Sequence, residues 1–295
     1  MSIFFNYNDT IYKEGALILS PDSRSLKYGD GLFETMKVNN GKIYLCDHHF
    51  ERLFAGMAIL QFEVPKHFTK AYLEKRISEL CKKNEHNSYA RVRLTIFRGN
   101  GGLYVAEDHT FRDFSSRRND GTFFHLPHYI IQTWPIEHTG ELNSNGLVID
   151  IYPDARKPCD TFANFKTNNF LPYAMAAIYA KQIKADDCIL LNSYDRICDS
   201  TIANIFIIKD NVIYTPALPE GCIAGVMRRF LIENLKGSNF NITERRVSIE
   251  DLENADEVFL TNSIRGIRWV KQFRNRTYKT DLVKDLYKTI HIGNY

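Results

Sequence analysis

The sequence has no long hydrophobic run. No apolar stretch in its 295 residues approaches the ~20 residues that a membrane-spanning helix needs. The opening residues MSIFFNYNDT do not place a basic segment before an apolar one, so no secretory signal is visible. These absences predict a cytoplasmic protein that has no membrane partner.

An excess of charge of one sign is also missing. Lys and Arg number 38 against 35 Asp and Glu, and the formal net charge is only +3. Nucleic-acid-binding domains instead concentrate positive charge on one face or helix, so the balance argues against nucleic acid as a partner. With 44% hydrophobic and 25% charged residues, the chain is typical of a globular protein of one large or two ordinary domains.

Signatures of metal and nucleotide binding are absent as well. None of the six cysteines forms a C-x-x-C pair, which favours reduced thiols. The close histidine pairs, His48-His49 and His125-x-x-His128, have no cysteine or carboxylate at ligand spacing, so we predict no metal site. No G-x-G-x-x-G, G-x-x-x-x-G-K-[ST] or G-x-S-x-G motif occurs where a nucleotide or a nucleophilic serine would need one.

The secondary-structure signals that are present mix helices and strands without strict alternation, which predicts an α+β fold. Residues 33–38 and 42–45 are rich in strand formers and flank an Asn-Asn-Gly turn, residues 47–60 show helical spacing of apolar residues, and residues 91–97 alternate. The alternation places Arg91 and Arg93 on one face of a strand. The polar stretch 115–121 predicts a linker between a smaller N-terminal domain (1–120) and a larger C-terminal domain (121–295).

Six short motifs, each weak alone, follow one another in a defined order. They are GDGLFET at 29–35, HFERL at 49–53, FKTNN at 165–169, DSTIANIF at 199–206, GVMR at 225–228 and TNS at 261–263. In this order and spacing the chain resembles the class IV (fold-type IV) pyridoxal-phosphate-dependent aminotransferases, which include branched-chain and D-amino-acid aminotransferases and aminodeoxychorismate lyase. The resemblance implies two α+β domains with the cofactor at their interface, and a homodimer.

The resemblance also implies a cofactor, pyridoxal 5'-phosphate, and residues to bind it. Lys166 in FKTNN would hold the cofactor as a Schiff base and later act as a general base and acid at the substrate Cα. Residues that match the phosphate-binding positions are Arg52, the backbone N–H groups of Val226 and Met227, and Ser263 with Asn262 beside it.

Asp199 matches the position whose carboxylate keeps the ring nitrogen of the cofactor protonated. Most of the family has glutamate there, so this side chain is one methylene shorter. Either the backbone approaches the ring more closely or a water bridges the gap. An aspartate with a purely structural role is the alternative.

Two arginines are candidates for the substrate carboxylate. Arg98 matches the Arg-Gly pair of the lyase and the D-amino-acid enzymes, whereas Arg93 matches an arginine of the branched-chain enzymes. Phe33 replaces a tyrosine of the D-amino-acid enzymes, which argues against a simple transfer of that specificity. Thr35 matches a strand threonine of the lyase, although such a threonine is usually structural.

The activity implied first is amino-group transfer between an amino acid and a 2-oxo acid. The close alternative is the release of pyruvate from aminodeoxychorismate to give 4-aminobenzoate. A third reading is a catalytically silent member of the family that still binds pyridoxal phosphate.

Overall fold

A computed structural model describes residues 3–86, 88–99, 126–137, 140–236 and 238–290. Its contacts divide the chain into two compact units, Met1–Glu137 with Lys166–Asn169, and His138–Phe165 with Phe170–Tyr295. The boundary expected after residue 120 lies outside the described residues. Among those described, His128–Pro135 belongs to the first unit because it pairs with strands of that unit.

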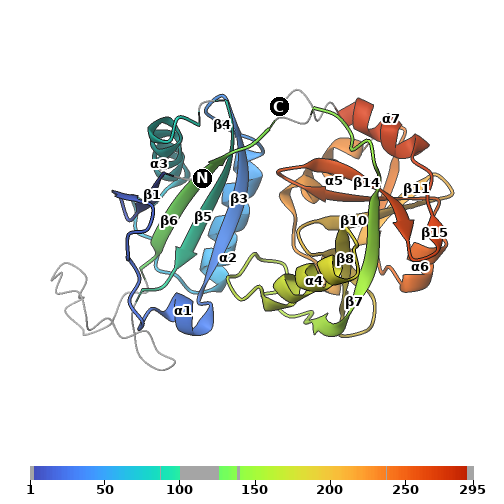
Figure 1. Ribbon diagram of the computed structural model, residues 1–295, viewed down its shortest axis with the longest axis horizontal. Coiled ribbons are helices and arrows are strands. Elements are labelled where there is room, and N and C mark those ends of the chain that lie inside the picture. Colours follow the sequence, from blue (N-terminus) through green and yellow to red (C-terminus); the bar gives the residue numbers. More distant parts are fainter. Residues whose placement is uncertain (1–2, 87, 100–125, 138–139, 237, 291–295) are drawn as a thin grey trace. The chain divides into compact units, whose positions relative to one another are not determined.

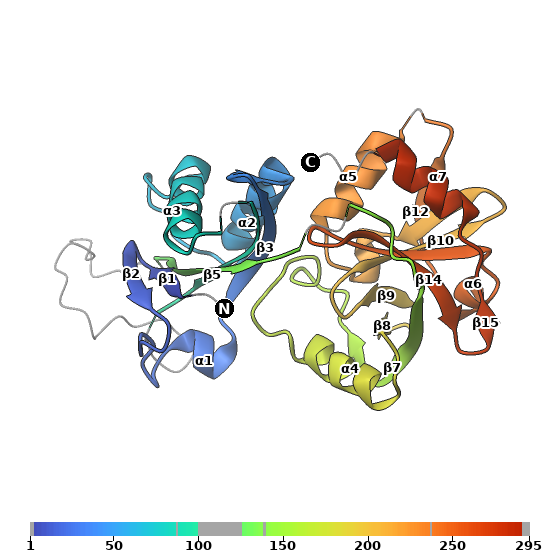
Figure 2. The same ribbon diagram turned by 45° about the horizontal axis from the view of Figure 1, so that its top comes forward.

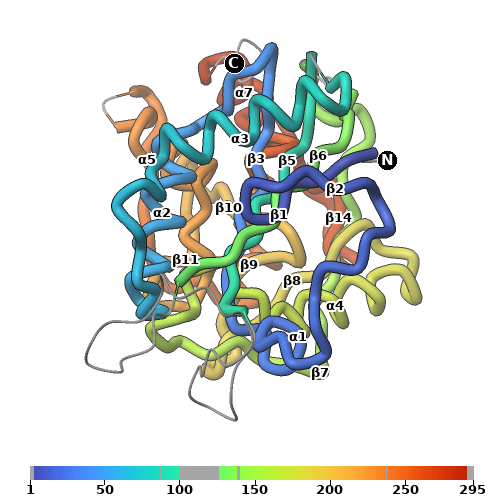
Figure 3. Tube along the Cα trace, turned by 90° about the vertical axis from the view of Figure 1, so that its left-hand side faces the viewer, coloured from blue at the N-terminus to red at the C-terminus, as the bar shows by residue number. Residues whose placement is uncertain are grey.

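The described part of the first unit is built on a six-stranded antiparallel sheet in the order β2-β1-β6-β5-β3-β4. The N-terminal hairpin, blue in Figure 3, lies along one edge. The predicted turn joins β3 to β4, with Asn40 and Gly41 both at positive φ. The strands are β1 (Phe4–Tyr7), β2 (Thr10–Lys13), β3 (Gly31–Asn39), β4 (Lys42–Ile43), β5 (Tyr89–Phe97) and β6 (His128–Pro135).

Helices α2 (Cys46–Ile59) and α3 (Lys70–Lys83) cover one face of this sheet, as Figure 1 shows, and α1 (Arg24–Tyr28) precedes β3. The helix expected over 47–60 is therefore confirmed. Alternate residues of β3 and β5 point into the apolar core under the helices, among them Leu32, Met36, Val92 and Leu94. By the same alternation, Phe33, Thr35 and Arg93 lie on the opposite face of the sheet.

A segment from far along the chain completes the free edge at the start of β3. Phe33 N–H donates to the Lys166 carbonyl (2.8 Å) and Asn168 N–H donates to the Gly31 carbonyl (2.8 Å), with Leu32 and Thr167 as an antiparallel bridge. Gly31 is required here because a Cβ would collide with the Ile96 carbonyl and the Asn168 side chain. This pairing places Lys166 beside β3.

The second unit contains a nine-stranded mixed sheet in the order β12-β11-β10-β13-β14-β7-β8-β9, with β15 on β14, among its described residues. The β11–β12, β14–β7 and β7–β8 pairs are parallel. The strands are β7 (Leu147–Lys157), β8 (Asp187–Asn192), β9 (Ile197–Ser200), β10 (Asn204–Lys209), β11 (Val212–Pro216), β12 (Asn241–Arg245), β13 (Glu257–Asn262), β14 (Gly266–Phe273) and β15 (Arg276–Thr277).

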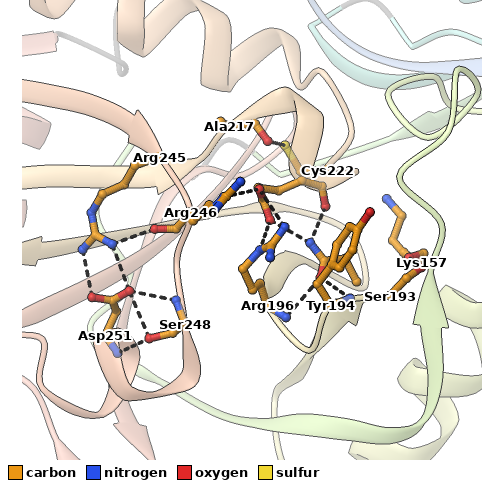
Figure 4. A network of polar contacts seen from close by, with 12 residues as sticks. Lys157, Ser193, Tyr194, Arg196, Ala217, Cys222, Arg245, Arg246, Ser248 and Asp251 are labelled. Carbon is orange, nitrogen blue, oxygen red and sulfur yellow. Dashed lines mark hydrogen bonds and ion pairs between the residues drawn. The ribbon is translucent and has the colours of Figure 1, made fainter.

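Helices flank this second sheet. Helix α4 (Leu171–Gln182) packs against β7 and β8 (Figure 2), and α5 (Val226–Leu235), α6 (Ile249–Glu253), α7 (Asp281–Ile290) and the short η2 (Leu218–Glu220) follow. Helix α6 is fixed by a capping box in which Ser248 and Asp251 bond reciprocally, and Arg245 pairs with Asp251 (2.9 Å; Figure 4). The expected α+β fold is confirmed. No helix in the described ranges is both long and apolar enough to cross a membrane.

Candidate active site

Lys166 lies on the face of the first sheet opposite α2 and α3, together with an aromatic ring and an arginine. Its Nζ lies 4.6 Å from the centroid of the Phe33 ring, and the Arg93 guanidinium carbon lies 3.7 Å from the same centroid. Thr35 is the register partner of Arg93 across the β3–β5 pair. Burial lowers the pKa of Arg93, with a smaller effect from Arg91. A lysine amine and a partly desolvated guanidinium thus both lie close to one ring.

Arg98, the other candidate for the substrate carboxylate, is bound elsewhere in the first unit. Its Nη1 lies 2.5 Å from Asp30 Oδ1, and its Nη2 donates to the Leu60 carbonyl. Asp30 also accepts from Arg24 Nε at 2.8 Å. The Arg98 side chain is only 11% exposed, so these contacts tie the end of β5 to the segments around Asp30 and Leu60.

Arg52 lies on the helix side of the sheet in a buried cluster. Its Nε and Nη2 donate to the two carboxylate oxygens of Glu34, at 2.7 and 2.6 Å, and His49 Nδ1 lies 2.6 Å from Glu34 Oε2. Burial alone would raise the pKa of Glu34, but Arg52 and His49 outweigh it and lower this pKa to about 2. The bidentate contact fixes the plane of the Arg52 guanidinium.

Asp199 is the centre of a second buried cluster, in the second unit. The residue is 1% exposed, and its Oδ2 accepts from Lys157 Nζ (3.2 Å), the Tyr173 hydroxyl (3.1 Å) and Ile223 N–H (2.9 Å). Its other oxygen, Oδ1, is buried and has no hydrogen-bond partner within the described ranges. A buried carboxylate oxygen of this kind is an acceptor that lacks its donor.

Asn204 connects the remaining predicted cofactor residues of the second unit. Its side-chain amide donates to the Ile223 carbonyl (2.8 Å), and its backbone is in register with Thr261, just before Asn262 and Ser263. Gly225, the N-cap of α5, has no room for a Cβ because Asn204 Oδ1 occupies that space. The start of α5, with Val226 and Met227 in its first turn, is therefore held near the end of β13.

Residues 31–273 match the family model described as amino-transferase class IV. The chain belongs to the class IV aminotransferase family. This family consists of pyridoxal-phosphate-dependent enzymes, and the expected family membership is confirmed.

Individual relatives within this family carry different activities. Aminodeoxychorismate lyase of Bacillus subtilis (strain 168) is 31% identical over 265 residues, which cover 87% of this chain and 82% of that protein. D-alanine aminotransferase of Bacillus licheniformis is 25% identical over 258 residues, or 87% and 83% of the two chains. The branched-chain amino acid aminotransferase from Escherichia coli, at 20% identity, has the same fold, with a TM-score of 0.81 over 98% and 92% of the two chains.

The residues present fit the cofactor of class IV aminotransferases. The buried, unpartnered Oδ1 of Asp199 is suited to accept a hydrogen bond from a ring N–H. The α5 N-terminus, with a glycine N-cap and no acidic residue in its first turn, is suited to an anionic phosphate. A primary amine that can bond to a carbonyl carbon is provided by Lys166. The candidate ligands are divided between the two units.

Three buried residues that contact the predicted cofactor residues were not identified from the sequence. Lys157 and Tyr173 contact Asp199 but lie outside the motifs, and their spacing from Asp199 carries no local pattern. Glu34 was visible in principle: it takes an inward position of β3 between Leu32 and Met36, where a charge needs a buried partner. No group of three or more His, Cys, Asp or Glu suited to a metal occurs in the described part of the chain.

Proposed function

We propose that this protein is an aminotransferase that uses pyridoxal 5'-phosphate to move an amino group between an amino acid and a 2-oxo acid. The observation that carries the proposal is the placement of Lys166 and Arg93 against one ring, that of Phe33, at 4.6 and 3.7 Å. Both substrates carry an α-carboxylate, and a guanidinium near the reactive lysine can bind it bidentately. Arg93 is the arginine that resembles that of the branched-chain enzymes.

The protein's own residues have separate tasks in this proposal. When bound, pyridoxal phosphate supplies an electron sink for the pair of electrons left at the substrate Cα. Lys166 would hold the cofactor through its carbonyl carbon and, once its amine is released, would take the proton from the substrate Cα and return a proton during amination of the 2-oxo acid. Arg93 binds the α-carboxylate, with Thr35 beside it, and the Phe33 ring excludes water from the lysine side. Asp199 Oδ1 would accept a hydrogen bond from the protonated ring nitrogen.

The residues proposed to bind the cofactor phosphate are Arg52, Val226, Met227 and Ser263, with Asn262 beside Ser263. Arg52 would contribute its guanidinium, oriented by Glu34. Val226 and Met227 would contribute their N–H groups at the α5 N-terminus, and Ser263 its hydroxyl, with Asn262 forming the turn beside it through bonds to the Ile264 and Arg265 N–H groups.

A direct assay tests the reaction. Purified protein loaded with pyridoxal phosphate is given a panel of L- and D-amino acids with 2-oxoglutarate, and separately aminodeoxychorismate. We expect new amino acid and 2-oxo acid products from the first mixture. Formation of 4-aminobenzoate and pyruvate from the second, without transfer in the first, would overturn the proposal.

Aminodeoxychorismate lyase is the second candidate function. It is favoured by the 31% identity to the Bacillus subtilis lyase. Its substrate also carries carboxylates, so Arg93 has a role in either reaction. The two assay mixtures therefore separate the candidates without any variant.

The carboxylate role of Arg93 makes a prediction of its own. In Arg93→Ala, the KM for the amino acid is expected to rise about 10- to 100-fold, the size of a lost charge-assisted contact, while cofactor affinity stays unchanged. Arg91→Ala is the matched control, because Arg91 lies on the same face of β5 but over the Trp134 ring, 4.4 Å from its centroid. A large KM increase in Arg98→Ala with a normal KM in Arg93→Ala would reassign the carboxylate to Arg98.

A further inference from the structure

Lys157 is a buried cation placed on the outer side of the Asp199 carboxylate. It is the last residue of β7 and is 4% exposed, an unusual position for a lysine unless its charge is paired. Its Nζ lies 3.2 Å from Asp199 Oδ2, the oxygen that also accepts from the Tyr173 hydroxyl and from Ile223 N–H. The three donors thus occupy one oxygen and leave Oδ1 to another partner.

Lys157 is held by contacts at its backbone and at the end of its side chain. Its carbonyl oxygen accepts from the N–H and the hydroxyl of Ser193, each at 3.1 Å (Figure 4). At the other end, Nζ lies 4.9 Å from the centroid of the Tyr173 ring, besides its contact with Asp199. The ammonium is therefore held between a carboxylate and an aromatic face, with little freedom to move away.

Two thiols and a hydroxyl that interact with Asp199 have raised pKa values, so they keep their protons and carry no charge at neutral pH. Burial raises the pKa of the Cys222 thiol to about 12 and raises the pKa values of the Cys198 thiol and the Tyr173 hydroxyl well above their ordinary ranges. Burial lowers the pKa of Lys157, but Asp199 outweighs it, and the net shift is upward. Lys157 is the cation of this cluster.

We propose that Lys157 is a positioning residue that neutralises the Oδ2 side of Asp199, so that Asp199 presents Oδ1 to the cofactor ring nitrogen as a charge-compensated acceptor. This inference rests on the proposed function, since the ring nitrogen belongs to pyridoxal phosphate. A cation beside Oδ2 makes it less favourable for the ring nitrogen beside Oδ1 to carry a second positive charge. The ring nitrogen therefore holds its proton less firmly than it would opposite an isolated carboxylate.

The ring nitrogen itself is the probe of this inference. Pyridoxal phosphate labelled with ¹⁵N is bound to the wild type, Lys157→Met and Lys157→Arg, and the ¹⁵N chemical shift is followed against pH. We expect the proton affinity of the ring nitrogen to rise about ten-fold or more in Lys157→Met and to stay near the wild-type value in Lys157→Arg. Lys209→Met is the matched control, because Lys209 pairs with Asp256 at 3.3 Å on the exposed surface of the same unit.

The outcomes separate this inference from the proposed function. An unchanged ring-nitrogen titration in a Lys157→Met protein that binds the cofactor overturns the role of Lys157 and leaves the proposed function standing. Failure of the wild type to take up the cofactor overturns both. If Lys157→Met does not fold, Lys157→Gln serves instead, because glutamine keeps a hydrogen-bond donor beside Asp199 Oδ2 without the charge. The proton affinity of the ring nitrogen should then rise as in Lys157→Met, and a titration equal to the wild type would overturn the inference.

Discussion

Replacing Lys166 with alanine is expected to remove the visible absorbance that the wild type acquires with pyridoxal phosphate, and to lower turnover by about 10²- to 10⁴-fold. The physical reason is that alanine has no amine to bond to the cofactor carbonyl or to exchange a proton at Cα. Lys166→Arg should fail in the same way, because a guanidinium keeps its charge but does not give up its proton. Absorption spectra and initial rates measure both effects.

The position of the covalent bond can be checked independently of activity. Reduction of the loaded wild type with borohydride, followed by peptide mass spectrometry, should place the pyridoxyl group on Lys166. Lys75→Ala is the matched control, because Lys75 is 70% exposed on α3 and should leave the spectrum and the rate unchanged. A pyridoxyl group on another lysine, or full turnover in Lys166→Ala, would contradict the assignment.

Local patterns were sufficient to predict the secondary structure around the candidate site. The hairpin of β3 and β4, the helix α2 and the strand β5 each follow from turn residues or from apolar periodicity within one segment. The same alternation correctly placed Arg91 and Arg93 on one face. These features depend only on neighbours in the chain, so a single sequence contains the information for them.

Contacts between distant segments could not be predicted in this way. The pairing of Lys166 and Asn168 with β3 joins segments far apart in the sequence, and nothing in FKTNN alone specifies which strand it would meet. The pair of Lys157 and Asp199 is separated by 42 residues and has no motif. The sequence also left Arg93 and Arg98 as equals, because only tertiary contacts reveal that Arg98 is engaged with Asp30.

Removing the charge of Glu34 should destabilise the first unit by about 3–5 kcal/mol, the usual cost of deleting one partner of a buried ion pair. Glutamine has nearly the same shape as glutamate, but Glu34→Gln removes the charge of the carboxylate that two guanidinium nitrogens of Arg52, a side chain 10% exposed, contact in the folded protein. Chemical unfolding of the cofactor-free protein measures the effect. Glu79→Gln, at an exposed carboxylate on α3 that pairs with Arg76, should change stability by less than about 0.5 kcal/mol.

The stabilisation by Glu34 should also depend on pH. Its pKa falls from an ordinary value of 4.5 to about 2 in the folded protein, so the unfolded chain binds more protons between these values. A carboxylate with a depressed pKa stabilises the fold above the unfolded pKa, here on the order of 3 kcal/mol, and this stabilisation is lost as the pH falls toward the folded value. Wild type should therefore lose stability between about pH 4.5 and pH 2 more steeply than Glu34→Gln.

His49 also contributes to the pH dependence of the unfolding free energy. Burial lowers the pKa of His49 from 6.5 despite the attraction of Glu34, so protonation of the unfolded chain at this histidine already destabilises the fold below about pH 6.5 in both proteins. The comparison is therefore made as a difference between wild type and Glu34→Gln at each pH. Because Glu34 holds up the pKa of His49 in the wild type only, that difference should be largest between about pH 6.5 and pH 4.5 and shrink below pH 4.5. A constant difference down to pH 3 would mean that the carboxylate charge of Glu34 is not what holds Arg52 and His49 in the fold.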